Sequence, residues 1–337
     1  MAGKARVIVM AVLLVAAYCS WGYGQVAPPT ILEVDVENYV QYVADTSDPS
    51  KFATDPGVTI VVQPKNFNLS LEIGDIVAVN GQPAKGTLTR NFQRVVLATA
   101  PNPGQAIADT VRNGLVAATF DFLKSDGSPI GTIVTYGPGP GSPAPGAPLA
   151  ITQGSFAITG GTGAFVGARG QWGQAVTPQT IAQRQASITE DPANRRRNGG
   201  GRVRFVLQVI PMSVPQIVTT AAGPAVTHSS DFSLVTASKP AAEGELLSMF
   251  VTGLGPTKPG VDPGKPFPAS PPAVVNSPVD VTVNGKSVEV TAAVGFPGAV
   301  DGYQVNFRVP SDSAKGTATI QVSAAWIAGP GVTINIQ

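Results

Sequence analysis

The sequence predicts an all-β protein with two domains. Three observations lead to this prediction. The 337-residue chain contains 38 glycines and 31 prolines, and both residue types interrupt helices. Apolar and polar residues alternate with a period of two in many short runs, which is the pattern of half-buried strands. Asn-Gly and Asp-Gly pairs stand between several of those runs and are typical of hairpin turns.

Residues 1–24 differ in character from the rest of the chain. Lys4 and Arg6 precede an apolar run over residues 7–17, and small residues follow as far as Gly24. Such a run is too short to cross a bilayer and is typical of a secretory signal peptide. We therefore expect cleavage after Gly24 and a mature chain that is secreted, either to the periplasm or to the outside of the cell.

Cys19 is the only cysteine, and it lies within that segment. Lipid attachment there is an alternative to simple cleavage, although Tyr18 stands where lipoprotein sites require a small residue. Without the segment the chain has no cysteine, so it forms no disulfide, and apolar cores must stabilise it. Its acidic and basic residues then nearly balance, which argues against nucleic acid as the main partner.

The first domain, predicted over residues 25–211, consists of successive hairpins. Asn80-Gly81 and Asp126-Gly127 each separate two extended runs. Two other runs each place four apolar residues on one face: Val116, Ala118, Phe120 and Phe122 in one, and Val203, Phe205, Leu207 and Val209 in the other. Because no run has a helical apolar period, we expect an antiparallel barrel or sandwich.

The segment GGTGAFVGARG, residues 160–170, has two interpretations. Its spacing G-x-G-x-x-x-G from Gly161 resembles a loop that binds a dinucleotide phosphate, but such a loop must open a helix. Gly167, Gly170 and Gly173 would lie inside that helix, at a cost of about 1 kcal/mol each relative to alanine. The segment also alternates with a period of two. We therefore expect a turn, then a curved barrel strand, and no nucleotide cofactor.

This segment resembles the turn and strand of the allene oxide cyclase and dirigent superfamily. The residues that match by position are Thr162, Gly163, Phe165, Ala168, Arg169 and Gly170. The expected barrel turn motif consists of Gly160, Gly161, Thr162, Gly163, Phe165 and Gly170. The resemblance implies an eight-stranded antiparallel barrel with a lumen, often in a dimer or trimer. It also implies chemistry that depends on the shape of an apolar lumen, with few acid or base groups and no metal.

The second domain, predicted over residues 216–337, follows a proline-rich joint at Pro211 and Pro215. Asn284-Gly285 is a strong hairpin signal, and the strand before it places three valines on one face: Val279, Val281 and Val283. The stretches ELLSMFVTGLG, YQVNFRVP and GTATIQVSA are further predicted strands. Several short strands at this spacing indicate an immunoglobulin-like sandwich.

Three motifs in this half resemble a C-terminal domain family of secreted proteins from soil bacteria. They are the Gly-Leu-Gly-Pro turn at residues 253–256, the hairpin at Asn284-Gly285 and the strand at residues 303–306. The resemblance implies an immunoglobulin-like accessory module to which no reaction is assigned.

Alternation along the predicted strands gives a set of candidate lumen or ligand-binding residues: Asp75, Arg90, Asp121, Tyr136 and Arg169. Asp121 lies opposite an apolar face, so it points into a polar lumen or into solvent. Solvent is favoured because an unpaired aspartate is rarely buried. Arg169 either contacts an anion in the lumen or packs its stem along the barrel and pairs with a neighbour, and we favour the structural role.

Two polar stretches have weaker interpretations. Arg195, Arg196 and Arg197 form a basic hairpin tip that would contact a phosphate or an anionic polysaccharide, or else a solvated loop. His228 is the only histidine, which excludes a histidine metal cluster. We interpret its surroundings, AVTHSSDFS, as polar surface sequence.

Three functions remain open from the sequence. The first is a secreted protein that binds a small hydrophobic molecule or a cell-surface partner without catalysis. The second is an isomerase, cyclase or dirigent-type enzyme that acts on a hydrophobic molecule in the lumen. The third is a structural component of the cell envelope. An open cavity with convergent polar groups would favour the enzyme, whereas a filled lumen would leave only surface binding.

Overall fold

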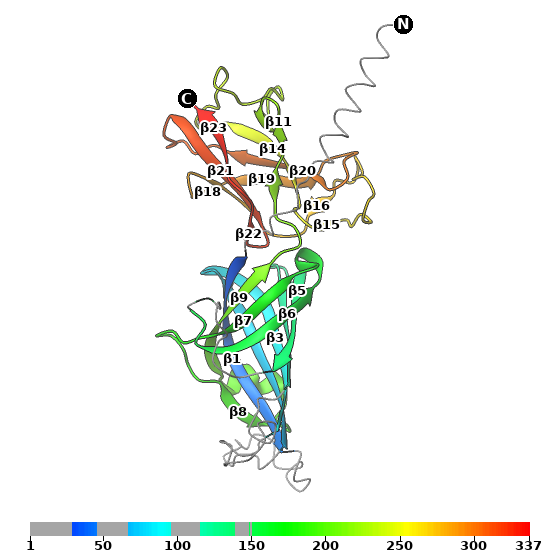
Figure 1. The fold of residues 1–337 in the computed structure, drawn as a ribbon, viewed down its shortest axis with the longest axis vertical. Helices are drawn as coiled ribbons and strands as arrows, with labels where there is room; N and C mark the ends of the chain where they lie inside the picture. The colour runs from blue at the N-terminus through cyan, green and yellow to red at the C-terminus, as the bar shows by residue number, and fades with distance from the viewer. Residues whose placement is uncertain (1–28, 46–66, 96–114, 139–147, 149) are drawn as a thin grey trace, which may run out of the picture.

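The protein forms a barrel from its N-terminal half and a β-sandwich from its C-terminal half, arranged end to end (Figure 1). This computed structural model describes residues 29–45, 67–95, 115–138, 148 and 150–337. The predicted signal peptide and Cys19 lie outside those residues. Within the described part of the chain, no helix is long and apolar enough to cross a membrane.

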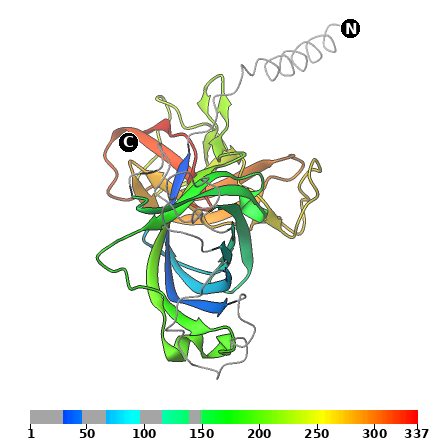
Figure 2. The ribbon, with the colours of Figure 1, turned by 60° about the horizontal axis from the view of Figure 1, so that its bottom comes forward.

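Eight antiparallel strands close into the barrel, in the order β1-β2-β3-β4-β5-β6-β7-β9 and back to β1 (Figure 2). Their bounds are β1 Thr30–Asp45, β2 Phe67–Val79, β3 Gln82–Val95, β4 Leu115–Leu123, β5 Pro129–Pro138, β6 Gln153–Gly161, β7 Arg169–Ala175 and β9 Gly201–Ile210. A further strand, β8 (Arg184–Ser187), pairs in parallel with the second half of β1. The prediction of an all-β fold with an antiparallel barrel is confirmed.

The predicted alternation matches the burial along the strands. The four apolar residues singled out on β4 and the four on β9 are all buried in the barrel core. Asn80 and Gly81 join β2 to β3 with φ angles of 51° and 73°, the left-handed geometry that Asn-Gly adopts readily in a type I′ turn. Turn chemistry and period-two patterning therefore fix the register of these hairpins.

The glycine segment joins β6 to β7, but its second part differs from the expected strand. Gly163–Phe165 forms a short 3₁₀ helix, η3, and β7 begins only at Arg169. The Phe165 ring lies inside the barrel end, 5.1 Å from the Phe122 ring. Burial of this ring, rather than strand pairing, sets the local conformation. The dinucleotide interpretation does not fit, because a three-residue helix offers no phosphate-binding N-terminus.

Two glycines of the motif stand where backbones approach closely. A Cβ atom at Gly170 would lie 1.9 Å from the carbonyl oxygen of Gln208 on β9, and the φ angle of Gly170 is 136°. A Cβ atom at Gly161 would lie 2.3 Å from the carbonyl oxygen of Phe165. Both positions therefore require glycine for steric reasons.

Aromatic rings fill the middle of the barrel. The ring centroids of Phe156 and Trp172 are 4.5 Å apart, and those of Trp172 and Phe120 are 5.2 Å apart. Phe205 lies 5.4 Å from Trp172. Phe122 follows Phe120 on the same face of β4 and continues this column toward the sandwich. Packed aromatic groups therefore separate the two ends of the lumen.

The C-terminal half packs two sheets around a second apolar core. The first sheet contains β10 Gln216–Ile217, β13 Val226–His228, β14 Leu246–Thr252, β15 Thr257–Lys258, β16 Val274–Val275, β19 Val290–Gly295 and β20 Gly302–Arg308. The second contains β17 Val279–Val283, β18 Lys286–Val288, β21 Gly316–Ala324, β22 Ile327–Ala328 and β23 Val332–Ile336. A separate hairpin pairs β11 Thr219–Thr220 with β12 Gly223–Pro224. The predicted Asn284-Gly285 turn joins β17 to β18.

The sandwich contacts the barrel through the two-residue turn between β21 and β22. Ala325 and Ile327 belong to the same buried apolar cluster as the barrel rings. The Trp326 ring, next to them, lies 5.6 Å from the Phe122 ring. Side chains of the second domain thus complete one end of the barrel core.

Candidate functional site

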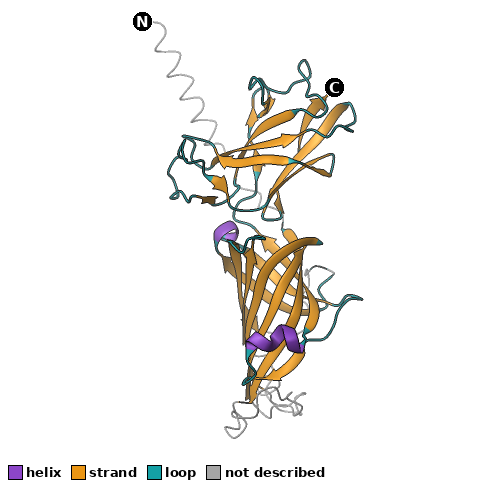
Figure 3. Ribbon diagram, turned by 180° about the vertical axis from the view of Figure 1, so that it is seen from behind, coloured by secondary structure: helices purple, strands orange, loops and turns teal. Residues whose placement is uncertain are grey.

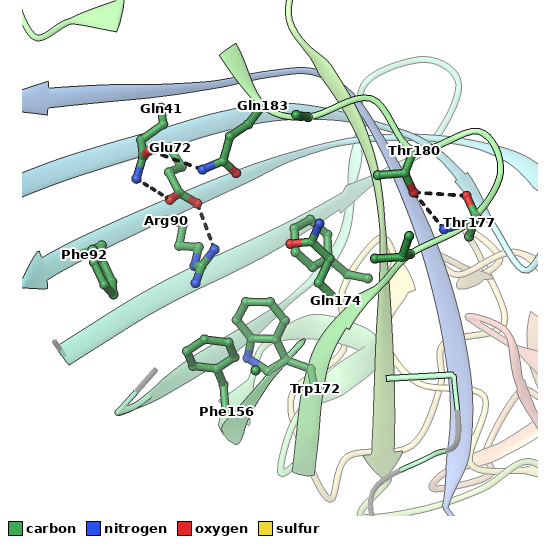
Figure 4. Close-up of a pocket in the computed structure, with 14 residues that line it drawn as sticks. Gln41, Glu72, Arg90, Phe92, Phe156, Trp172, Gln174, Thr177, Thr180 and Gln183 are labelled. Carbon is green, nitrogen blue, oxygen red and sulfur yellow. Dashed lines mark hydrogen bonds and ion pairs between the residues drawn. The ribbon is translucent and has the colours of Figure 1, made fainter. Parts of the chain in front are cut away.

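The barrel has an open cavity of about 690 Å³ at the end away from the sandwich (Figure 4). This volume lies within the usual range of small-molecule sites. The polar residues that line the cavity are Gln41, Glu72, Arg90, Gln174, Thr177, Thr180 and Gln183. Its aromatic residues are Phe92, Phe156, Trp172 and Phe205. The lumen is therefore open at this end, and its lining is not wholly apolar.

Three neighbouring strands bring a buried hydrogen-bonded network to the inner wall. Glu72 on β2 stands in register with Arg90 on β3 and with Gln41 on β1. Arg90 Nη1 donates to Glu72 Oε2 at 2.9 Å and to the Tyr39 hydroxyl oxygen at 3.3 Å. The Tyr39 hydroxyl donates to the same Oε2, and Gln41 Nε2 donates to Oε1 at 3.1 Å. Both carboxylate oxygens therefore have partners.

The surroundings fix the protonation of two members of this network. Burial raises the pKa of Tyr39 well above its usual value, and the adjacent Glu72 adds to the shift. Burial disfavours the charged form of Arg90, but the attraction of Glu72 and the contact with Tyr39 outweigh it, so the pKa of Arg90 is raised. The cavity wall therefore presents a permanent cation, and the neutral phenol of Tyr39 is buried next to it, outside the cavity lining.

Arg90 also has hydrogen-bond donors without a partner among the described residues. Its guanidinium carbon lies 5.0 Å from the Phe156 ring centroid and 5.5 Å from that of Trp172, an arrangement that favours a cation. Its side-chain hydrogen bonds to described residues use only Nη1, and its Nε is buried without a partner. The Trp172 indole nitrogen is buried and unpartnered among the described residues as well. A buried donor without an acceptor is unfavourable. Arg90 Nη2 also makes no hydrogen bond to a described residue, and Arg90 lines the cavity.

Uncharged amides lie beside this network. Gln41 Oε1 accepts hydrogen bonds from Gln183 and Gln185, each at 3.2 Å. Glu72 and Arg90 are the only charged residues among the described residues that line the cavity. The formal charges of the described lining therefore cancel.

Arg90 is the one predicted lumen residue that lines the cavity. Asp121 lies on the outer face, because its neighbours on β4 point into the core. Tyr136 is 52% exposed, and Arg169 is exposed and donates to the preceding carbonyl group. Asp75 lies outside the lumen too, since it pairs with residues that cover the barrel wall. These four side chains contribute nothing to the cavity lining.

The predicted anion-contact loop is held against the barrel by Asp75. Arg195 Nη2 lies 2.7 Å from Asp75 Oδ1, and Arg196 Nε lies 3.0 Å from Oδ2. These pairs fasten the short helix α2 (Arg195–Asn198), which follows η4 (Pro192–Asn194), to the outer wall (Figure 3). Burial opposes ionisation of Asp75, but hydrogen bonds from both arginines outweigh it and lower its pKa to about 2. Arg197 is exposed.

The interpretation of AVTHSSDFS as polar surface sequence is wrong for His228, although Ser230 and Asp231 are exposed. The His228 side chain is 4% exposed and lies within the sandwich. Its Nδ1 is 2.6 Å from Glu245 Oε1, and its Nε2 is 3.3 Å from the Lys239 carbonyl oxygen. It has a structural role there. Among the described residues, no group of three or more His, Cys, Asp or Glu side chains is arranged to hold a metal ion.

Sequence reasoning misses Glu72 because β2 inverts the usual pattern. Ser70 and Glu72 are buried on the inner face, whereas the apolar Leu71 between them is only partly buried on the outer face. Arg90 was the sequence signal for a carboxylate partner. Leu88 and Phe92, two residues before and after it, are apolar, which places Arg90 on the inner face. An inward arginine requires a carboxylate on an adjacent strand.

Comparison with known proteins adds little. No known family profile matches the chain, and no curated protein matches it. A solved structure of a polysaccharide lyase aligns with 91% of this chain and 40% of its own chain, at 9% identity and a TM-score of 0.18. The chain thus spans less than half the length of that protein. A similarity this low carries no argument about fold or function, so the geometry of the cavity is the guide to what the protein does.

Proposed function

We propose that the barrel binds an uncharged small molecule, with an apolar ring and oxygen acceptors, in the cavity at its open end. The buried Glu72–Arg90 pair on the wall of that cavity carries the proposal. A buried ion pair is often no more stabilising than well-packed apolar residues of the same volume. Stability of the barrel therefore does not explain why the pair is there, whereas recognition of a polar group does.

Charge balance in the cavity favours an uncharged ligand. A carboxylate that approached Arg90 would also approach Glu72, whose Oε2 lies 2.9 Å from Arg90 Nη1, and the two anions would repel each other. A carbonyl, hydroxyl or ether oxygen can accept from Arg90 Nη2, which has no partner among the described residues, without that penalty. The aromatic side chains Phe92 and Phe156 provide apolar surface for a ring.

Two sequence features support the same proposal. The resemblance to allene oxide cyclases and dirigent proteins supports a function inside the lumen, and it also supports a homo-oligomer formed by the barrel. The segment at residues 1–24 supports secretion. A secreted barrel would bind its ligand outside the cytoplasm.

An isomerase or cyclase acting in the same cavity is the second candidate, favoured by the convergence of Tyr39, Glu72 and Arg90. In such a reaction the Glu72 carboxylate takes a proton from the carbon next to a carbonyl group. The electron pair of that C–H bond moves onto the carbonyl oxygen, where the Arg90 donors stabilise the enolate. In a β,γ-unsaturated ketone the enolate is conjugated with the C=C bond. Glu72 then returns the proton to the γ-carbon while the carbonyl group re-forms and the double bond moves to the α,β position.

A cavity-filling variant tests the binding proposal. Ala182 is exposed and lines the cavity, whereas Ala157 is exposed on the outer face of β6. Ala182→Trp should occupy the mouth, and Ala157→Trp should project into solvent. Saturation-transfer NMR with 2-naphthalenemethanol as the probe should show binding to the wild type and to Ala157→Trp, and loss of binding in Ala182→Trp. Equal binding by both variants would contradict a lumen site.

Proton exchange separates catalysis from binding. The protein is incubated with 2-tetralone in D₂O, and loss of the α-proton signals is followed by NMR. Exchange above the buffer rate that falls to the buffer rate in Glu72→Gln would support the isomerase. An exchange rate equal to that in buffer alone would contradict the isomerase and would support binding without catalysis.

A further inference from the structure

We propose that the second domain closes the barrel: the turn at Ala325 and Trp326 is a plug that makes the lumen single-ended and supports the floor of the cavity. This closure does not depend on what the cavity binds. It assigns to the sandwich a role in the barrel site that no resemblance implies.

The turn has residues that its conformation disfavours. Ala325 and Trp326 have φ angles of 48° and 63°, which lie in the left-handed region. This conformation is energetically unfavourable for residues that carry a Cβ atom. The comparable turns after β2 and β17 use Asn-Gly, which is well suited to that region. A strained conformation persists only where surrounding contacts over-determine it. The contacts of this turn with the barrel provide that compensation.

Those contacts are apolar and tightly packed. Ala325 is 1% exposed and Ile327 is 4% exposed, both within the barrel's own core cluster. The space that Ile327 shares with the barrel end, beside Phe165 and Val209, is only about 10 Å³, which is at the lower limit for one water molecule. A direct hydrogen bond from Asn276 Nδ2 to the Pro129 carbonyl oxygen, 2.6 Å long, adds a second attachment. These groups therefore leave little free space at this end of the barrel.

The plug is continuous with the cavity floor. Trp326 packs on Phe122, and Phe120 on the same face of β4 packs on Trp172. Trp172 in turn lines the cavity with Phe156. Loss of the plug would leave the Phe122 ring without packing on the side of the sandwich. It would also open the lumen at the end next to the sandwich.

Cysteine labelling tests the closure directly. Val209 is fully buried beside Ile327, so Val209→Cys, in a Cys19→Ser background, reports access to the closed end. N-ethylmaleimide should label it slowly when the turn is intact. Replacing the turn by Asn-Gly (Ala325→Asn with Trp326→Gly) keeps a hairpin that favours its own conformation and removes the plug. We expect labelling at least tenfold faster in that variant, and an intermediate rate in Trp326→Leu.

Val305→Cys is the matched control, because Val305 is fully buried in the core of the sandwich. It should remain protected with either turn. An unchanged labelling rate at Val209→Cys after removal of the plug would overturn the proposal. Equal acceleration at both cysteines would also overturn it, since the turn would then stabilise the whole chain rather than close the barrel.

Discussion

Glu72 and Arg90 stand directly opposite each other on paired strands, and Arg90 Nη1 lies 2.9 Å from Glu72 Oε2 on the inner wall of the barrel. The exposed fractions of the two side chains are 4% and 11%. Neither charge can therefore rely on water if its partner is removed. This pair supplies the charged groups of the described cavity lining. Substitution of its members tests how much the buried charges affect the stability of the barrel.

Removing one member of the pair should destabilise the barrel more than removing both. Glu72→Leu leaves Arg90 uncompensated, and Arg90→Met leaves Glu72 uncompensated, so each should lower the free energy of unfolding by about 3 kcal/mol. The double variant should lie within about 1 kcal/mol of the wild type or above it. Urea denaturation measures all three. A double variant whose loss equals the sum of the single losses would contradict this account.

Two glycines with positive φ angles should respond differently to a methyl group. A Cβ atom at Gly170 would lie 1.9 Å from the Gln208 carbonyl oxygen. A Cβ atom at Gly81 would have no neighbouring atom within 4 Å. Gly81→Ala should cost about 1–2 kcal/mol from backbone strain alone. Gly170→Ala should cost at least about 3 kcal/mol, because the strands must also separate. Similar melting temperatures for the two variants would refute the steric explanation.

Asp75 should make stability depend on acid pH. Its pKa is 3.8 in the unfolded reference and about 2 in the folded barrel, so its contribution is complete above about pH 4 and is lost as the pH falls through 2. Asp75→Asn should lose on the order of 1–2 kcal/mol at pH 7. Its difference from the wild type should disappear near pH 2. Asp312→Asn, in an exposed pair with Lys286, is the control and should show little change at either pH. A constant deficit of Asp75→Asn from pH 7 to pH 2 would exclude this pairing.

Arg169→Met should be nearly silent. The side chain is exposed, and its one hydrogen bond to a described residue goes to the neighbouring Ala168 carbonyl oxygen. Loss of such a contact should change the free energy of unfolding by no more than about 0.5 kcal/mol. Binding of 2-naphthalenemethanol should also be unchanged, because the residue does not line the cavity. A large effect on either quantity would restore one of the roles considered from the sequence.

Local signals predicted most of the barrel. Strands β4 and β9 were readable because every second residue is apolar, and the hairpin at Asn80-Gly81 because its turn requires positive φ angles. Local patterning predicts a strand around Phe165, since no local rule indicates that this ring packs inside the barrel end. The conformation of this segment depends on contacts with Phe122, far away in the sequence.

The site was less predictable than the fold. Alternation alone places Arg90 inside, but its partner Glu72 lies in a part of β2 where the apolar Leu71 and Ile73 face outward. The sequence predicts Asp75 as a lumen residue and Arg195 as part of an anion-contact loop, because their pairing depends on a short helix that folds back over the barrel. The burial of His228 is missed for a similar reason. Its partner Glu245 lies 17 residues away in the sequence, just before β14. Long-range pairing of polar groups is not encoded in local periodicity.

The central claim, that the cavity accepts uncharged rather than anionic ligands, is tested most directly with two probes that share a ring. Calorimetric titration of the wild type at pH 7 compares 2-naphthalenemethanol with 2-naphthoate. We expect saturable binding of the alcohol and at least tenfold weaker binding of the carboxylate, with that preference reduced in the Glu72→Leu/Arg90→Met double variant. Tighter binding of the carboxylate, or binding of neither probe, would contradict the claim.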